Sequence, residues 1–198
     1  MSGDPSVGAV ILAAGSSRRY GSPKQLVVVD GMTLLEHAIA AAAVAGLQPV
    51  VAVVPVWLSR PARYDDERLL WIRNAFPERG LSVSLRLGLD ALVGMVEAAV
   101  ILLGDQPRLP RESIGRLLAA RGDRPIVASL AGGVLAPPVL IEASQFHLAD
   151  EISGDIGLRQ MLTDHPELVR GVEVDGHPPD IDTPDDLDRA GGPRRMPA

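Results

Sequence analysis

The chain has 198 residues, of which 46% are hydrophobic and only 3% are aromatic, and its formal net charge is −6. This composition can bury an aliphatic core, and the negative charge argues against a nucleic-acid polymer as partner, because such binders usually carry a basic patch. The chain has no cysteine, which excludes disulfides, thiol catalysis and cysteine-bound zinc. We expect a cytoplasmic protein without a membrane partner, because no basic segment precedes an apolar run at the amino terminus and no apolar stretch approaches the ~20 residues of a membrane helix.

Apolar runs that alternate with helical patterns predict strands that alternate with helices along the chain. The expected strands, in chain order, are 7–12, 49–54, 69–73, 98–103, 125–130, 134–141 and 168–174. The expected helices are 34–45, with Thr33 and Glu36 as a capping box, and then 82–93, 110–120, 143–149, 155–162 and 184–189. A short extended piece is expected at 25–29, and 58–66 is expected to be irregular or briefly helical. We expect a single domain over residues 1–190 and a disordered tail over 191–198, which is rich in Gly, Pro and Arg.

This order of elements predicts an α/β fold with a mainly parallel sheet, because strand–helix–strand units form right-handed crossovers. In such sheets, ligands bind at the carboxyl ends of the strands. Two distinctive segments are expected there: the loop that follows 7–12, and Gly104-Asp105, which follows 98–103. The coincidence of these two segments predicts a binding site.

The loop from Gly15 to Lys24 has the composition of an anion site. It combines glycines, serine hydroxyls and three cationic side chains within seven residues of an otherwise acidic chain: Gly15, Ser16, Ser17, Arg18, Arg19, Gly21, Ser22 and Lys24. Backbone N–H groups and such side chains bind phosphates at a strand-to-loop turn. The loop fits neither the G-x-x-x-x-G-K pattern nor the G-x-G-x-x-G pattern. A solvated basic surface loop is the alternative.

Asp105 is a candidate magnesium ligand, since Mg²⁺ prefers carboxylate and phosphate oxygens and keeps several waters. A turn residue or helix cap is the alternative for this side chain. A second ligand is expected from Asp182 or Asp180, with Asp182 favoured. No histidine pair has the spacing of a metal site.

The segment Leu12 to Lys24, LAAGSSRRYGSPK, resembles L-A-A-G-x-S-x-R-M-G-x-P-K, the opening motif of the molybdenum cofactor nucleotidyltransferases. Further blocks follow in the order of that family: Asn74 with Gly80 to Gly88 (N-x-x-x-x-x-G-x-x-x-S-L-x-x-G), Leu103 to Pro107 (L-G-D-x-P), Gly154 to Arg159 (G-D-x-G-x-R) and Asp180 to Leu187 (D-I-D-T-P-E-D-L). The resemblance spans residues 7–189. It implies a Rossmann-like three-layer α/β/α fold of the nucleotide-diphospho-sugar transferase type.

The resemblance also implies roles for individual residues. Arg19, Lys24 and Asp105 are the expected catalytic residues, with Mg²⁺ on Asp105 and on Asp182 or Asp180. The expected nucleotide-binding residues are Leu12, Ala13, Ala14, Gly15, Ser16, Ser17, Arg19, Lys24, Asn74, Ser84, Gly104 and Asp105. The expected acceptor-binding residues are Pro138, Asp155 and Arg159. Ala14 stands where the family has Ala for cytidylyl and Gly for guanylyl transfer, which implies CTP. The chain departs from the family at Tyr20, where Met is usual, and at Ala136-Pro137-Pro138, where Gly-His-Pro is usual.

The predicted reaction is transfer of CMP from CTP to a phosphate-bearing acceptor, with molybdopterin or molybdenum cofactor implied by the resemblance, and release of pyrophosphate. A molybdenum hydroxylase or its chaperone is a possible protein partner. Three alternatives stay open: an oxidoreductase of the same family that uses NAD(P)H, a non-catalytic nucleotide-binding maturation factor, and a cytidylyltransferase with a sugar or polyol phosphate acceptor.

Overall fold

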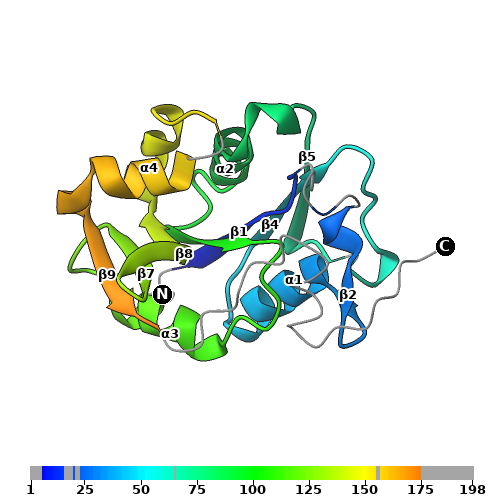
Figure 1. Cartoon of the computed structure of the whole chain (residues 1–198), viewed down its shortest axis with the longest axis horizontal. Helices are drawn as coiled ribbons and strands as arrows, with labels where there is room; N and C mark the ends of the chain where they lie inside the picture. Colours follow the sequence, from blue (N-terminus) through cyan, green and yellow to red (C-terminus); the bar gives the residue numbers. More distant parts are fainter. Residues whose placement is uncertain (1–5, 16–19, 21–22, 65, 155–156, 175–198) are drawn as a thin grey trace.

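The computed structural model describes residues 6–15, 20, 23–64, 66–154 and 157–174 of the chain. In this part of the chain, seven strands form one sheet with the order β5-β4-β1-β6-β8-β7-β9 (Figure 1). The strands of the sheet are β1 (Val7–Leu12), β4 (Val50–Pro55), β5 (Leu69–Asn74), β6 (Ala98–Leu103), β7 (Ile126–Ala131), β8 (Val134–Glu142) and β9 (Val169–Glu173). A separate small hairpin is formed by β2 (Val28–Val29) and β3 (Met32–Thr33).

Helices cover both faces of the sheet, which gives three layers (Figure 1). The α-helices are α1 (Leu34–Val44), α2 (Leu81–Asp90), α3 (Arg111–Ala119) and α4 (Gly157–Asp164). Short 3-10 helices are η1 (Lys24–Leu26), η2 (Ala62–Tyr64), η3 (Pro77–Arg79), η4 (Ala143–Asp150) and η5 (Pro166–Leu168). Side chains of α1 and α3 belong to the core on one face of the sheet, and side chains of α2, η4 and α4 belong to the core on the other. None of the helices in the described residues is long and apolar enough to cross a membrane.

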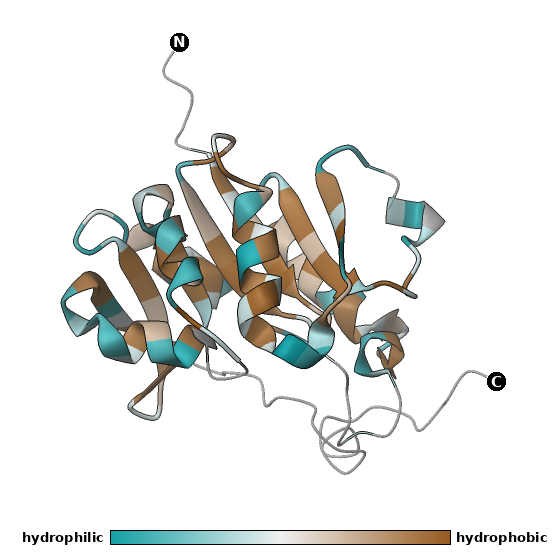
Figure 2. Cartoon of the chain, turned by 90° about the horizontal axis from the view of Figure 1, so that it is seen from above, coloured by the Kyte–Doolittle hydropathy of each residue, from teal (hydrophilic) through white to brown (hydrophobic). Residues whose placement is uncertain are grey.

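The central strands are buried on both faces, and their side chains alternate between the two cores. In β1, Ala9 and Ile11 pack with α1, whereas Val10 and Leu12 pack with α2. Figure 2 shows hydrophobic residues concentrated on the strands, with hydrophilic residues on the helices and loops around them. Helix α2 lies close to β1, because a Cβ atom built on Gly88 would come within 2.2 Å of Cγ1 of Val10. The near absence of aromatic side chains is therefore matched by an aliphatic, closely packed core.

The order of the strands reverses beside β1. The chain passes from β1 through α1 to β4, then to β5, and returns through α2 to β6 on the other side of β1. The strands β4, β1 and β6 are parallel, and Leu12 is in register with Val53 on one side and Leu103 on the other. The carboxyl ends of β1 and β6 therefore lie side by side where the strand order reverses, which is the usual ligand position in open α/β sheets.

The predicted α/β class and mainly parallel sheet are confirmed, and each predicted strand is found with small shifts of its ends. The strand β8 is antiparallel to both β6 and β7, while β7 and β9 are parallel. The predicted capping box is also confirmed, with the N–H of Thr33 donating to Oε2 of Glu36 at 2.8 Å and the N–H of Glu36 donating to Oγ1 of Thr33 at 3.3 Å.

Several predicted helices have other bounds or another type. The helix predicted at 82–93 ends at Asp90, and the chain then turns through Gly94 at a φ of 75°. The segment predicted as helix at 143–149 is the 3-10 helix η4. The extended piece predicted from residue 25 begins instead as the 3-10 helix η1. The helix predicted at 155–162 is α4, which ends at Asp164, and residues 155–156 lie outside the described residues. The predicted helix 184–189 and tail 191–198 also lie outside them.

Candidate active site

The segments that follow β1 and β6 are held together by their backbones. The N–H of Gly104 donates to the carbonyl of Leu12 at 3.0 Å, and the N–H of Ala13 donates to the carbonyl of Val53 at 2.9 Å. A Cβ atom at position 104 would lie 2.6 Å from Cβ of Ala13, a distance that real Cβ atoms essentially never show. Glycine at position 104 therefore allows the two strand ends to approach closely, and this contact places Asp105 beside the loop that follows β1.

Lys24 and Asp105 form an ion pair at this strand reversal. Nζ of Lys24 lies 3.3 Å from Oδ2 of Asp105, and the two side chains are 11% and 29% exposed. The two residues are 81 positions apart in sequence, so the fold rather than local structure brings them together. The pair contains the two kinds of group that a metal–triphosphate complex needs, a cation for phosphate oxygens and a carboxylate for a divalent metal.

Lys24 is carried by η1, whose conformation follows from the local sequence. Pro23 has no N–H and a φ of −61°, its carbonyl accepts the N–H of Leu26 at 3.1 Å, and the carbonyl of Lys24 accepts the N–H of Val27 at 2.9 Å. The same short helix carries Gln25, whose buried side chain donates to the carbonyls of Ala13 and Gly15. Sequence reasoning missed Gln25, because no motif spacing distinguishes it from an ordinary polar residue next to Lys24.

Gly15 follows shortly after the end of β1. Its φ lies outside the left-handed region, so the conformational freedom of glycine is not used at this position in the structure. A Cβ atom built on Gly15 would meet none of the described residues within 4 Å. Ala13 and Ala14, which follow β1 directly, are buried, at 3% and 2% exposed.

Asn74 and Ser84 are brought together at the end of β5. Nδ2 of Asn74 donates to Oγ of Ser84 at 3.0 Å, and Oδ1 of Asn74 accepts the N–H of Phe76 at 2.8 Å. Both side chains are buried. The N-cap of α2 is Gly80, at a φ of 92°, so Ser84 does not cap this helix. The pair fixes the start of α2 at the carboxyl edge of the sheet, and direct contact of either residue with a nucleotide stays a prediction.

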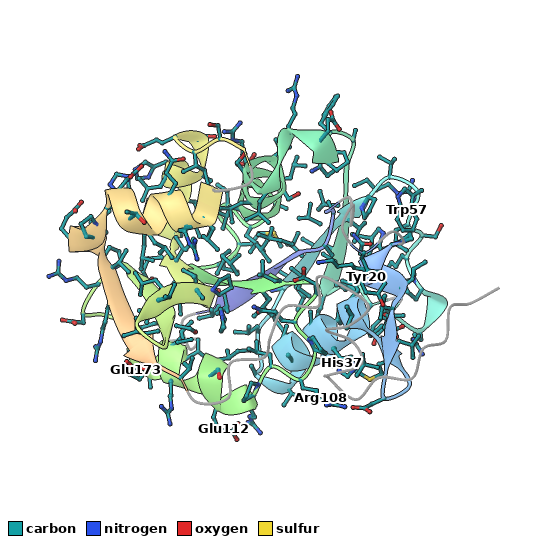
Figure 3. All side chains as sticks on the ribbon, in the orientation of Figure 1. Tyr20, His37, Trp57, Arg108, Glu112 and Glu173 are labelled. Atoms are coloured by element: carbon teal, nitrogen blue, oxygen red, sulfur yellow. The ribbon has the colours of Figure 1, made fainter. Side chains whose placement is uncertain are left out.

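Tyr20 packs against a small apolar cluster. The buried residues of this cluster are Val29 and Leu34, and Tyr20 and Val27 pack against them. Figure 3 shows Tyr20 on the side of the hairpin β2–β3 and α1. The departure from the family's Met at this position is therefore a change in apolar packing beneath the hairpin.

The hairpin is also tied to the segment that follows β6, through a pair that sequence reasoning did not predict. Arg108, labelled in Figure 3, donates to Oδ2 of Asp30 from Nε at 2.9 Å and from Nη2 at 2.6 Å. Both residues have a positive φ, 58° for Arg108 and 50° for Asp30. Such a backbone is uncommon for residues other than glycine and often occurs near functional sites.

Of the predicted acceptor residues, Pro138 lies on β8 and Arg159 lies on α4. The register between β7 and β8 shifts so that Pro137 and Pro138 are not paired with residues of β7, which agrees with their lack of an N–H. Oγ of the buried Ser129 donates to the carbonyl of Pro138 at 3.0 Å. Pairing of β8 with β6 ends at Val139 and Ile101, so Pro138 lies at the carboxyl edge of β6. Arg159 is exposed on α4, and no hydrogen bond or ion pair among the described residues joins it to Lys24 or Asp105.

Several predicted site residues lie outside the described residues: Ser16, Ser17, Arg18, Arg19, Gly21, Ser22, Asp155, Asp180 and Asp182. Asp105 is thus the one predicted metal ligand that the structure describes. No group of three or more His, Cys, Asp or Glu side chains that could hold a metal ion exists within the described residues. A partly exposed carboxylate at this edge nevertheless fits Mg²⁺, which takes few protein ligands and completes its shell with water and phosphate oxygens.

Comparison with known proteins identifies the family. Residues 9–169 match the MobA-like NTP transferase domain. The chain belongs to this family of nucleotidyltransferases. It is 28% identical over 192 residues to the purine catabolism protein PucB of Bacillus subtilis (90% of this chain, 93% of PucB). It is 30% identical over 194 residues to the nicotine blue oxidoreductase of Paenarthrobacter nicotinovorans, with 93% of each chain covered.

Solved structures agree with this assignment. The crystal structure of Rv0371c from Mycobacterium tuberculosis matches with a TM-score of 0.82 at 25% identity, covering 94% of this chain and 97% of that one. The 4-diphosphocytidyl-2C-methyl-D-erythritol synthase of Anaerococcus prevotii matches with a TM-score of 0.77 at 15% identity, covering 94% and 96% of the two chains. At that identity the second likeness concerns the fold alone. The predicted Rossmann-like, nucleotide-diphospho-sugar transferase type of fold is thus confirmed for this MobA-like protein.

Proposed function

We propose that this protein transfers CMP from CTP to a phosphate-bearing acceptor, molybdopterin or molybdenum cofactor, and releases pyrophosphate. The observation that carries the proposal is the Lys24–Asp105 pair at the strand reversal beside β1, with Nζ and Oδ2 3.3 Å apart. In the absence of substrate, the cation and the carboxylate neutralise each other. When a metal–triphosphate binds, Lys24 gains phosphate oxygens and Asp105 gains the cation, so neither charge is left uncompensated.

The reaction needs little proton transfer. A phosphate monoester has a second pKa of about 6, so the acceptor is largely ionised near neutral pH and attacks the α-phosphorus without a general base. The protein then has to align the two substrates and neutralise the charge that develops on the leaving pyrophosphate. Lys24 supplies one positive charge at this edge of the sheet, and Arg19 is proposed to supply a second.

Mg²⁺ is the proposed metal, held by Asp105 and by Asp182 or Asp180. When bound, it would neutralise phosphate charge and hold the triphosphate in one orientation. A solved complex with manganese of the M. tuberculosis protein Rv0371c, which is 22% identical to this chain, supports a divalent cation. Ser16, Ser17 and Arg19 are proposed to complete the nucleotide site, and Asp155, Arg159 and Pro138 the acceptor site.

CTP is the proposed nucleotide because Ala14 stands at the position that distinguishes cytidylyl from guanylyl transfer in the resemblance. The side chain of Ala14 is 2% exposed beneath the loop. A 29% identical relative over 167 residues, from Psychrobacter arcticus, is named 2-C-methyl-D-erythritol 4-phosphate cytidylyltransferase. We further propose a single domain over residues 1–190 with the tail 191–198 outside it, a cytoplasmic location, and a molybdenum hydroxylase or its chaperone as partner.

The test is pyrophosphate release from CTP, GTP or ATP, with and without Mg²⁺, against molybdenum cofactor, a sugar phosphate and a polyol phosphate. We expect release with CTP, Mg²⁺ and molybdenum cofactor, and its loss in Asp105→Asn. The control is Asp66→Asn, which removes one carboxylate from an exposed site near η2. Pyrophosphate release with only a sugar or polyol phosphate would identify that compound, and not molybdenum cofactor, as the acceptor. Magnesium-dependent nucleotide binding without pyrophosphate release would indicate a maturation factor. Absence of magnesium-dependent nucleotide binding would contradict the proposal.

An oxidoreductase is the second candidate, and one observation favours it: the 30% identity to nicotine blue oxidoreductase extends over 93% of both chains. This function requires a redox cofactor such as NAD(P)H. Oxidation of NADH or NADPH at 340 nm in the presence of a dye acceptor would favour it. An Asp105→Asn variant that loses pyrophosphate release but keeps this oxidation would separate the two activities.

A further inference from the structure

Gln25 is a buried polar residue, and the reaction proposed above gives it no role. Its side chain is 4% exposed, and Nε2 donates two hydrogen bonds, to the carbonyl of Ala13 at 2.7 Å and to the carbonyl of Gly15 at 2.8 Å. These two carbonyls belong to the loop that leaves the end of β1. One side-chain amide therefore bridges alternate residues of the backbone that is expected to bind the triphosphate.

The direction of these hydrogen bonds determines how the loop backbone faces. In a trans peptide group the N–H points opposite to the C=O. Since the carbonyl of Ala13 is turned towards Gln25, the N–H of Ala14 points away from it. The carbonyl of Gly15 is turned towards Gln25 in the same way. The N–H of Ala13 donates to the carbonyl of Val53. With the hydrogen bond from Gln25, both backbone polar groups of Ala13 are paired, which fixes the backbone at the end of β1.

The remaining atom of the side chain supports a functional role. Oε1 of Gln25 is buried and has no hydrogen-bond partner among the described residues. Exchanging Oε1 and Nε2 would not relieve this, because Oε1 would then face two carbonyl oxygens at 2.7 and 2.8 Å. Both donors of the amide are therefore engaged with the loop, while Oε1 has no partner among the described residues. Unsatisfied buried groups in native structures are rare, and each calls for an explanation such as stored strain or a catalytic role.

We propose that Gln25 is a positioning residue of the nucleotide site. Its amide holds the carbonyls of Ala13 and Gly15 towards Gln25, so that the N–H of Ala14 faces the triphosphate. This inference rests on the proposed use of the loop by a nucleoside triphosphate, but it does not depend on which base or acceptor is used. Lys24 and Gln25 then have complementary tasks, since the first contributes charge and the second orients the backbone.

The test compares Gln25→Met, which keeps the volume and removes both donors, with Gln25→Glu, which keeps the shape and faces the carbonyls with a carboxylate. The readouts are calorimetric binding of inorganic triphosphate and turnover in pyrophosphate release. In Gln25→Met we expect turnover to fall about 10²-fold, the typical effect of misplacing a reacting group by about 1 Å, with weaker triphosphate binding. The losses in Gln25→Glu should be larger.

The control is Ile114→Val, which opens a small cavity in the core under α3. It should lower the melting temperature and leave triphosphate affinity and turnover per folded molecule unchanged. A folded Gln25→Met variant with wild-type affinity and turnover would overturn the assignment of Gln25 alone. A wild-type chain that binds no triphosphate would overturn the assignment together with the proposed function.

The wild-type chain gives an independent measurement if Gln25→Met does not fold. In a ¹⁵N-labelled sample, the two Nε2 protons of Gln25 should exchange slowly with solvent, because both are hydrogen-bonded inside the protein. They should remain protected when inorganic triphosphate binds. Rapid exchange in the folded wild type would show that the amide does not hold the loop, and would also overturn the assignment.

Discussion

Substitution of Lys24 by methionine should separate catalysis from folding. Methionine keeps most of the aliphatic stem and removes the charge that lies 3.3 Å from Oδ2 of Asp105. Because the Asp105 side chain is 29% exposed, water can replace part of the lost interaction. The stability cost therefore falls between that of an exposed pair, below about 1 kcal/mol, and that of a fully buried pair, about 3–5 kcal/mol. We expect about 1–2 kcal/mol.

The effect on turnover should be larger, because a preorganised cation at a site of developing charge typically contributes about 10²–10³-fold, or about 3–4 kcal/mol. Pyrophosphate release at saturating nucleotide and urea unfolding measure the two quantities on the same preparation. Arg68→Met is the control, since it removes one positive charge from an exposed ion pair with Asp66. A loss of turnover no greater than that explained by unfolding would make Lys24 a structural residue and refute the reasoning.

Three further substitutions test the framework of the site. Gly104→Ala should lower the free energy of unfolding, measured by urea unfolding, by about 1–3 kcal/mol, because its methyl group would overlap Ala13. The control Gly115→Ala should be neutral or stabilising, because a Cβ there meets nothing within 4 Å. Asn74→Ala should cost about 1–3 kcal/mol by the same measurement, since it leaves buried hydrogen-bonding groups without a partner. Arg121 donates two hydrogen bonds of 2.8 Å to Glu142, which raise the pKa of Arg121. Arg121→Met should therefore lower the free energy of unfolding by about 1–3 kcal/mol. An unchanged midpoint of urea unfolding would show that the pair contributes nothing to stability.

The strands could be predicted well because the sheet is buried on both faces, so β1, β4 and β6 are continuous apolar runs. The helix type was less predictable. The residues of η4 have a helical composition, but nothing in the sequence distinguishes a 3-10 helix from an α-helix there. The antiparallel direction of β8 was also not predicted, because a short connection through Gly132 and Gly133 allows a hairpin without specifying its partners.

For the site, the sequence predicted which segments meet but not how they are held. The apolar runs that end at Leu12 and Leu103 predicted neighbouring strand ends, and the structure places the two residues in register. The contact of Gly104 with Ala13 could not be foreseen, since it depends on the separation of two strand ends. The two hydrogen bonds of Gln25 were equally hidden, because they depend on the direction in which carbonyl groups point.

The short helix η1 explains how two adjacent side chains reach the ends of two different strands. In a 3-10 helix, successive side chains are separated by about 120°, whereas in a strand they point to opposite faces. Lys24 can therefore reach Asp105 after β6 while Gln25, the next residue, reaches the carbonyls after β1. The two strand ends lie side by side, so both targets are on the same side of η1. An extended segment here would direct one of the two side chains away from the strand ends. The predicted extended piece is found at Val28–Val29, but the site depends on the part before it, which is a 3-10 helix instead.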